Sequence, residues 1–562
     1  MQQDNRIPDP LVTATPSAYD YPLLVKQLLV NALAVSAKQQ ITYRGETRYS
    51  YADLRRRIGQ LASMLSSSGV KAGTTVAVMD WDSHRYLESY FAVPMMGATL
   101  FTVNVRISPK QIAYTLNDSG AQVLIANAEF LPLLEQIWGS LAHPPLLIVA
   151  RDDDCSVETA SSLPVACDYE LRLSMSSSDF VFGDFDERTR AVLFYTTGTT
   201  GDPKGVTYSH RQVVLHALAT AATLASPREG QRLHREDVYM PITPMFHVLA
   251  WGMPYIAVML GLKIVLPGRY EPHLLLRLKQ TEQVTFSHCV PTILQMLLDG
   301  ARGDSFDLSG WKMMIGGSAL SPGLCRAALD RGIDVFAGYG MSETGPIVAL
   351  SQFPPGAMHA EADKDAGTDE SVRRRCMAGR PVPMVDLRVV DGDMCDVPRD
   401  GRTQGEVVLR APFLTLGYHG KPEASEALWA GGYLHSQDVA VMHPDGYVQI
   451  VDRIKDVIKT GGEWVSSIEI EALINEVPGV QESAVIGVKD ERWGERPMAL
   501  VVRRPGSAVS VATIRQRLLA LAEASRISRY AVPEATRIVF LDEMPKTSVG
   551  KLDKKRLREW ID

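Results

Sequence analysis

The sequence has few cysteines, no excess of positive charge and no long uninterrupted apolar run. Its six cysteines include no C-x-x-C pair, so we predict no zinc site, redox motif or disulfide framework. The formal net charge of −7 disfavours a nucleic-acid partner, which would select a basic face. The polar start MQQDNRIPDPLVTATPS lacks the charged beginning and apolar core of a signal peptide. We therefore expect a cytoplasmic protein.

The longest apolar stretch is too short to cross a bilayer. It runs from 248 to 262, is interrupted by glycine and proline, and falls short of the roughly twenty residues that a spanning helix needs. We expect no transmembrane segment here, but one buried helix that leads into a strand at 263–266.

Short apolar runs bounded by turn residues alternate with helical patterns. Such runs are typical of strands buried on both faces of a parallel sheet, and they lie at 75–80, 121–127, 146–150, 191–197, 263–267 and 312–317. Between them, 51–65 has the spacing of an amphipathic helix that stops before Gly69. The alternation predicts an α/β fold.

The chain of 562 residues is long enough for more than one domain. Beyond Asp452 the pattern changes to helix, strand, strand, helix and a lysine-rich end, typical of a small α+β unit. We divide the chain into 1–452 and 453–562. We also expect surface loops at 151–166 and 355–375, with the arginines at 373–375 on a solvated face.

The segment 195–206 (YTTGTTGDPKGV) carries the strongest chemical signal. Its glycines let the backbone approach a polyphosphate, and its hydroxyls and exposed N–H groups can donate to phosphate oxygens. Lys204 adds a compact positive charge. A flexible turn after a strand is the alternative, but the composition favours phosphate binding, although the spacing is not that of a Walker P-loop.

This segment resembles the phosphate loop of the adenylate-forming superfamily, which contains acyl-CoA synthetases, firefly-type luciferases and peptide-synthetase adenylation domains. The resemblance extends from about Tyr21 to Leu557. Further signatures follow in family order: PMFHV (244–248), GYGMSETG (338–345), Asp438, DRIKDVIK (452–459), GGEW (461–464) and PKTSVGK (545–551). MFHVLAW (245–251) and GGEW are most similar to bacterial medium- and long-chain fatty acid:CoA ligases and methylmercaptopropionate:CoA ligases.

The resemblance implies an adenylate-forming fold. Its large N-terminal domain would have parallel-type sheets with helices and a small β-rich subdomain. Its small, mobile C-terminal domain would turn on a hinge near Lys455.

The nucleotide and metal roles have support from residue chemistry as well. Tyr339 can stack on adenine, Ser342 can donate to the α-phosphate, and Glu343 suits Mg²⁺. Core packing is the alternative for Tyr339, and a turn aspartate for Asp438. The resemblance implies the same roles, with Asp438 on the ribose hydroxyls, although Gln437 replaces the usual glycine before it. The predicted ATP and AMP residues are Thr196, Thr197, Gly198, Thr199, Thr200, Gly201, Lys204, Gly317, Ser318, Gly338, Tyr339, Gly340, Ser342, Asp438, Arg453, Lys455, Lys459 and Lys551, with Thr196 and Glu343 at the metal.

His247 and Trp251 are four residues apart and would share one face of a helix. Two core side chains are the ordinary interpretation of such a pair, whereas the resemblance places them at the acyl site, with Trp251 gating a chain tunnel. It also implies that Lys551 bridges carboxylate and α-phosphate. The predicted catalytic residues are Lys551, Lys204, Glu343 and His247, and the predicted CoA-binding residues are Gly461, Gly462 and Trp464.

The resemblance thus implies an ATP-dependent acid:CoA ligase that uses ATP, Mg²⁺ and coenzyme A. It would form acyl-AMP and pyrophosphate, then acyl-CoA and AMP, from a medium- or long-chain fatty acid. Methylmercaptopropionate or another short acid is an alternative. A carrier-loading adenylation domain is less favoured, because no aspartate accompanies His247 and no carrier-like segment follows Asp562. A non-catalytic binding protein would not need the four charged motif residues. A homodimer is compatible with the resemblance.

Overall fold

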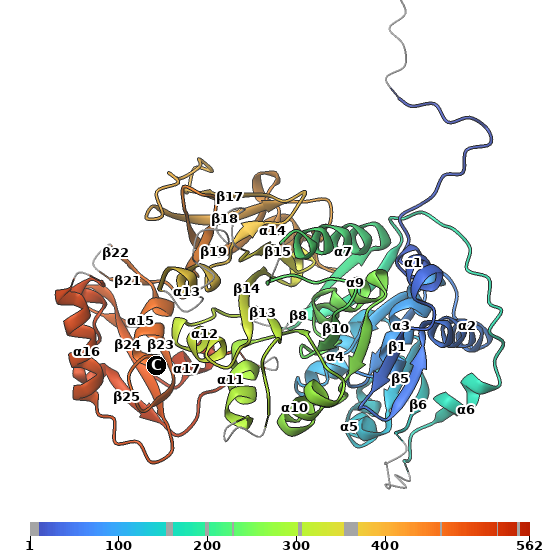
Figure 1. Ribbon diagram of the computed structural model, residues 1–562, viewed down its shortest axis with the longest axis horizontal. Helices are drawn as coiled ribbons and strands as arrows, with labels where there is room; N and C mark the ends of the chain where they lie inside the picture. The colour runs from blue at the N-terminus through green and yellow to red at the C-terminus, as the bar shows by residue number, and fades with distance from the viewer. Residues whose placement is uncertain are drawn as a thin grey trace, which may run out of the picture.

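The computed structural model describes residues 11–152, 161–196, 202–227, 230–301, 306–352, 369–460, 463–524, 526–547 and 551–561. These residues form four sheets with helices packed around the two larger ones (Figure 1). Strands and helices alternate through the first two-thirds of the chain. The predicted α/β fold is confirmed.

A seven-stranded sheet has the order β7-β6-β5-β3-β4-β8-β9 and is parallel except for the β8–β9 pair. Its strands are β3 (Thr75–Met79), β4 (Thr99–Thr102), β5 (Val123–Asn127), β6 (Leu146–Ala150), β7 (Val165–Asp168), β8 (Arg190–Thr196) and β9 (Lys204–Ser209). The helices in this part of the chain are α3 (His84–Met95), α4 (Pro109–Ser119), α5 (Leu131–Ile137), α6 (Tyr169–Ser174) and α7 (His210–Ala225).

A nine-stranded sheet has the order β16-β15-β14-β13-β12-β10-β11-β1-β2, with antiparallel pairs at its two ends. Its strands are β1 (Gln40–Tyr43), β2 (Thr47–Ser50), β10 (Val238–Pro241), β11 (Lys263–Leu266), β12 (Phe286–Cys289), β13 (Lys312–Ile315), β14 (Asp334–Gly340), β15 (Ile347–Leu350) and β16 (Arg380–Pro381). The helices are α1 (Gln27–Ser36), α2 (Tyr51–Ser67), α9 (Met253–Leu260), α10 (Pro272–Thr281), α11 (Pro291–Gly300), α12 (Pro322–Leu329) and α13 (Asp369–Arg375).

Two smaller sheets complete the molecule and carry its later residues (Figure 1). The first is antiparallel and contains β17 (Asp386–Val390), β18 (Gln404–Arg410), β19 (Leu434–Met442) and β20 (Val448–Arg453), with α14 (Pro422–Leu428) between β18 and β19. The second contains β21 (Ile458–Thr460), β22 (Glu463–Val465), β23 (Val480–Asp490), β24 (Gly494–Arg503) and β25 (Ile538–Leu541), with α15 (Ser467–Asn475), α16 (Val511–Glu523) and α17 (Lys554–Glu559). These sheets confirm the expected β-rich subdomain and small C-terminal α+β unit.

Local sequence explains where the predicted helix at 51–65 begins and ends. Ser50 caps α2 by accepting the backbone N–H of Asp53, whose carboxylate accepts the N–H of Ser50 in return. The helix runs two residues beyond the predicted end, and Gly69 then takes a left-handed φ of 90°.

The prediction of one helix over 248–262 is wrong. The element α8 (Val248–Trp251) is a single left-handed turn, since all four residues have φ between 46° and 59°. Gly252, at φ 72°, separates it from the right-handed α9. Left-handed backbone costs about 1–2 kcal/mol per non-glycine residue. Burial of Leu249 and Trp251 offsets that cost.

The expectation of a surface loop over 355–375 fails at its end, where α13 forms. Arg373 stays partly exposed, as expected of a solvated face, but Arg375 is buried. Its guanidinium forms an ion pair with Asp334 at 2.6 Å and donates to the carbonyl of Val335. The sequence pattern of three adjacent arginines does not reveal that one of them points inward.

Candidate active site

The end of β8 and the start of β9 hold the two described ends of the predicted phosphate loop. Thr196, the last residue of β8, pairs in register with Lys204, the first residue of β9, and its hydroxyl lies 3.5 Å from the Lys204 carbonyl. The predicted residues Thr197, Gly198, Thr199, Thr200 and Gly201 lie outside the described part of the chain.

Glu343 lies in a short 3₁₀ turn that follows β14 and is buried. Its Oε1 accepts the Tyr418 hydroxyl at 2.8 Å, and the Lys204 ammonium stands 4.8 Å from the centre of the Tyr418 ring. Burial raises the pKa of Glu343, while Tyr418 and Lys204 oppose that rise. The structure therefore brings Glu343 and Lys204 together through Tyr418, which the motifs did not identify.

Asp438 and Tyr339 meet from different sheets. The Tyr339 hydroxyl donates to Asp438 Oδ2 at 2.8 Å, and Arg453 reaches Oδ1 of the same carboxylate at 3.3 Å. Burial raises the pKa of Asp438, and the charge of Arg453 is the largest effect that opposes it. The predicted nucleotide residues Tyr339, Asp438 and Arg453 thus form one contiguous group.

Gln437 keeps the turn that a glycine would make more easily. It has φ 59°, its N–H donates to Glu406 at 3.0 Å, and its carbonyl accepts the N–H of Ile454 at 2.9 Å. These two bonds hold a conformation that a side chain disfavours. The Asp438 carboxylate thus keeps its contacts with Tyr339 and Arg453 although Gln437 stands at the position before it.

Lys551 reaches from the C-terminal unit to the turn after β13. Its Cε lies 3.1 Å from the position that a Cβ on Gly317 would occupy, so the lysine side chain packs closely on this glycine, whose φ is 79°. Burial, then the charge of Arg453, lowers the pKa of Lys551 to about 8, opposed by Asp438 and Glu343. The Lys551 ammonium thus interacts electrostatically with both Asp438 and Glu343.

Close packing against backbone at Gly340 and against side chains at Gly338 surrounds two other motif glycines. At Gly340 a Cβ would lie 1.6 Å from the Pro346 carbonyl oxygen, so no other residue fits there. At Gly338 it would lie 3.1 Å from Leu350. Ser318 is exposed, and the Ser342 carbonyl accepts the Tyr208 hydroxyl at 2.7 Å.

His247 precedes the left-handed turn and Trp251 is its last residue, so the two side chains do not share a helix face. The Trp251 ring packs against Gly316, where a Cβ would stand 2.9 Å away, and lies 5.0 Å from the His288 ring. Burial, then the charges of Lys551 and Arg106, lowers the pKa of His247 to about 3, so the imidazole is neutral at pH 7.

Three buried side chains that the motifs did not reveal fix the backbone before His247. Asp82 accepts the N–H of Met245 at 2.8 Å, Tyr90 donates to the Met245 carbonyl, and Thr102 donates to the Phe246 carbonyl at 2.9 Å. All three come from the neighbourhood of the seven-stranded sheet, far away in sequence. No local signal in the sequence marks them.

The predicted residues of the second half-reaction are not gathered at this site. Lys459 is exposed on β21, with its N–H donating to Glu495, and pairs in register with Trp464 on β22. Lys455 is exposed just beyond β20. Gly461 and Gly462 lie outside the described residues.

The site fits Mg²⁺ only together with a phosphate ligand. Within the described ranges, no group of three or more His, Cys, Asp or Glu side chains could hold a metal ion. Mg²⁺ commonly takes one or two carboxylates and completes its shell with waters and phosphate oxygens. Glu343, a buried carboxylate with a raised pKa, is such a ligand, since a bound cation would stabilise its charged form.

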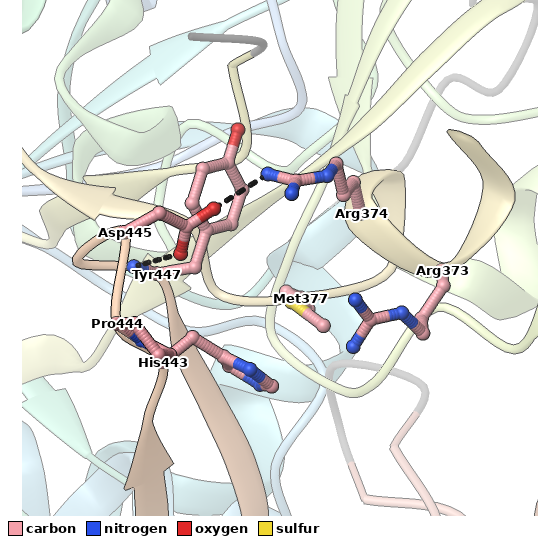
Figure 2. A pocket seen from close by; sticks show the side chains of 7 residues that line it. All are labelled: Arg373, Arg374, Met377, His443, Pro444, Asp445 and Tyr447. Carbon is pink, nitrogen blue, oxygen red and sulfur yellow. Dashed lines mark hydrogen bonds and ion pairs between the residues drawn. The ribbon is translucent and has the colours of Figure 1, made fainter. Parts of the chain in front are cut away.

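A separate cavity of about 290 Å³ lies beside α13 and contains none of the predicted site residues. Figure 2 shows Arg374 against Asp445, which it meets at 2.7 Å, while Glu370 accepts a second bond from it at 2.8 Å. The carboxylates of Glu370 and Asp445 therefore already neutralise the positive charge of Arg374. The cavity is lined by Arg373, Arg374, Met377, His443, Pro444, Asp445 and Tyr447.

Comparison with known proteins identifies the family to which this chain belongs. The model of the AMP-binding enzyme family matches residues 30–419, and that of the AMP-binding enzyme C-terminal domain matches 469–551. The chain belongs to this family.

Relatives refine this assignment. A long-chain-fatty-acid–CoA ligase from Thermus thermophilus is 38% identical over 96% of both chains. A 3-methylmercaptopropionyl-CoA ligase from Ruegeria pomeroyi is 35% identical over 96% of this chain and 97% of its own. An anthranilate CoA ligase solved with anthranoyl-AMP has a TM-score of 0.82 at 26% identity, over 96% of this chain and 98% of its own.

Within the family, the chain is one of the AMP-forming acid:CoA ligases, which use ATP, Mg²⁺ and CoA with a carboxylic acid. In the described part of the chain, no helix has the length and apolar character needed to cross a membrane.

Proposed function

We propose that this chain activates an aliphatic carboxylic acid of medium or long chain. The acid carboxylate attacks the α-phosphorus of ATP and expels pyrophosphate, and CoA thiolate then attacks the acyl-AMP to give acyl-CoA and AMP. The observation that carries the proposal is the position of Lys551. Its side chain packs on Gly317, and the charges of both Glu343 and Asp438 act on its ammonium. An ammonium there can neutralise two approaching anions.

The roles of the individual residues belong to the same proposal. Lys204 and the loop that precedes it hold the phosphates, Glu343 and Thr196 hold Mg²⁺, and Asp438 accepts the ribose hydroxyls. Tyr339 lies beside the adenine, with the turn at Gly317 and Ser318 along its edge. His247 and Trp251 border the acid. We further propose that residues 453–562 turn about Lys455 and bring Lys459, Gly461, Gly462 and Trp464 to the CoA path.

The acid is assigned from the apolar surroundings of the turn at 248–252 and from the fatty-acid ligase among the relatives. An apolar tunnel gains about 0.8 kcal/mol per buried CH₂, or roughly fourfold in kcat/KM. We expect kcat/KM to rise from C4 towards C8–C12. The 3-methylmercaptopropionyl-CoA ligase among the relatives favours a second candidate, a short thioether acid.

The test is pyrophosphate release from ATP with acids from C3 to C18 and methylmercaptopropionate, first without CoA and then with it. The proposal requires pyrophosphate before CoA is added and a thioester only afterwards. Equal kcat/KM for acetate and octanoate would eliminate the chain-length assignment, and no pyrophosphate with any acid would eliminate the function itself.

A further inference from the structure

The left-handed turn and helix α7 together line a small cavity. Its volume is about 10 Å³, room for about one water molecule. Leu249 and Gly252 contribute to its wall from the turn, and helix α7 contributes Gln212, Val213 and His216. It therefore adjoins the proposed acyl site, and the inference below rests on that proposed function.

The imidazole of His216 is held in one orientation at this cavity. The ring lies between two backbone segments, because a Cβ on Gly252 would stand 2.9 Å from Nδ1 and a Cβ on Gly345 would stand 2.9 Å from Cδ2. Only glycine at both positions leaves room for the ring. The Nδ1 edge therefore faces the cavity wall that Gly252 forms.

The hydrogen bonds of His216 decide which nitrogen carries the proton. Nε2 accepts the backbone N–H of Ile347 at 3.1 Å and lies 3.4 Å from the Thr220 hydroxyl. Burial lowers the pKa of His216 to about 4, so the ring is neutral at pH 7. A neutral ring whose Nε2 is an acceptor carries its proton on Nδ1.

That Nδ1–H has no acceptor among the described residues, since both hydrogen bonds of the ring are made by Nε2. The other polar side chains around the cavity are engaged elsewhere. Tyr208 donates to Ser342, Tyr255 donates to the Tyr90 carbonyl at 3.0 Å, and Gln212 donates to the Leu414 carbonyl. A donor that faces so small a cavity is costly unless it is paired, so its acceptor comes from water or from the substrate.

We propose that His216 is a specificity-determining residue whose Nδ1–H donates to an oxygen acceptor on the acyl chain, so that the preferred substrates are aliphatic acids bearing a carbonyl or ether oxygen. An unsubstituted acid of equal length would leave the donor unpaired. A hydrogen-bonding site rejects such analogues more strongly than an apolar pocket does.

The test compares C5 to C8 acids with their (ω−1)-oxo counterparts, in which a carbonyl replaces one CH₂ of nearly the same size. The measured quantity is the ratio of kcat/KM for the oxo acid to that for the plain acid. We expect a ratio of about ten at one chain length in the wild-type enzyme, the value of one neutral hydrogen bond. A ratio near one at every length overturns the inference.

Variants locate the effect. His216→Phe keeps a planar ring between the two glycines but removes the donor, so the ratio should fall below one. His216→Leu serves the same purpose if the first variant does not fold. His216→Asn keeps a side-chain N–H near the Nδ1 position and should retain part of the preference. Thr220→Val, which removes only the 3.4 Å contact with Nε2, is the control and should leave the ratio unchanged.

The outcomes separate the two proposals. If plain and oxo acids both release pyrophosphate but His216→Phe or His216→Leu keeps the wild-type ratio, only the role of His216 is refuted. If neither series releases pyrophosphate, the proposed function fails first.

Discussion

Lys551 offers a test in which pH itself is the perturbation. Burial and Arg453 lower its pKa from the usual 10.5 to about 8. In the proposed mechanism the charged form is active, because it neutralises the carboxylate and the α-phosphate as they approach. Activity carried by this group is therefore present below pH 8 and is lost as the pH rises through that value.

The expected size of the effect follows from the shift. With a pKa of about 8, roughly nine-tenths of the free enzyme is charged at pH 7 and about a tenth at pH 9. An ordinary lysine would stay almost fully charged over that range. We therefore expect kcat/KM for ATP in adenylation to fall about tenfold between pH 7 and pH 9. The fall in kcat should begin at higher pH, because bound phosphates raise the lysine pKa.

The assay is pyrophosphate release in the absence of CoA, so that ionisation of the CoA thiol does not contribute. Lys551→Ala should abolish acyl-adenylate formation, yet still convert supplied acyl-adenylate and CoA to acyl-CoA at a substantial fraction of the wild-type rate. Lys555→Ala, a half-exposed lysine on α17, is the control and should leave both half-reactions intact. Constant kcat/KM up to pH 9.5, or equal loss of both half-reactions in Lys551→Ala, would refute the reasoning.

Three further substitutions test other parts of the site. Glu343→Gln removes the charge proposed to bind Mg²⁺ while an amide oxygen can still accept from Tyr418, so adenylation should fall by orders of magnitude with little change in Tm; near-normal pyrophosphate release at saturating ATP and Mg²⁺ would contradict this. Trp251→Ala should change the chain-length profile of kcat/KM more than the KM for ATP, whereas a purely packing role would lower Tm and leave the profile unchanged. Gln437→Gly relieves a φ of 59° and should raise the free energy of unfolding in urea by up to about 1 kcal/mol; a clear loss of stability would show that the side chain contributes more than the strain costs.

The elements that sequence predicted well are those with a strong local pattern. The apolar runs at 75–80 and 146–150 became β3 and β6, because a strand buried on both faces needs no polar alternation. The helix at 51–65 became α2, because Ser50 and Asp53 cap its start. Gly340, the last residue of β14, belongs to the motif GYGMSETG, and backbone crowding there admits nothing larger than glycine.

The residues that sequence did not reveal act through tertiary contacts. Tyr418 is a tyrosine in a loop, and only the fold brings its hydroxyl to Glu343 and its ring to Lys204. Asp82 binds Met245 across a sequence separation of 163 residues. Neither the residue type nor the neighbouring residues distinguish such positions from ordinary core or surface side chains, so a pattern-based argument has nothing from which to infer them.

The left-handed turn has a consequence for how an acid enters. Trp251 packs against Gly316 and His288, and the cavity beside Leu249 and His216 has a volume of about 10 Å³. Because this space has room for about one water molecule, an acyl chain can enter it only by displacing side chains. The turn stores strain in four consecutive non-glycine residues, so moving Leu249 or Trp251 is less costly there than in a regular helix. In the proposed function, chain-length selection at this place therefore depends on how far the turn yields.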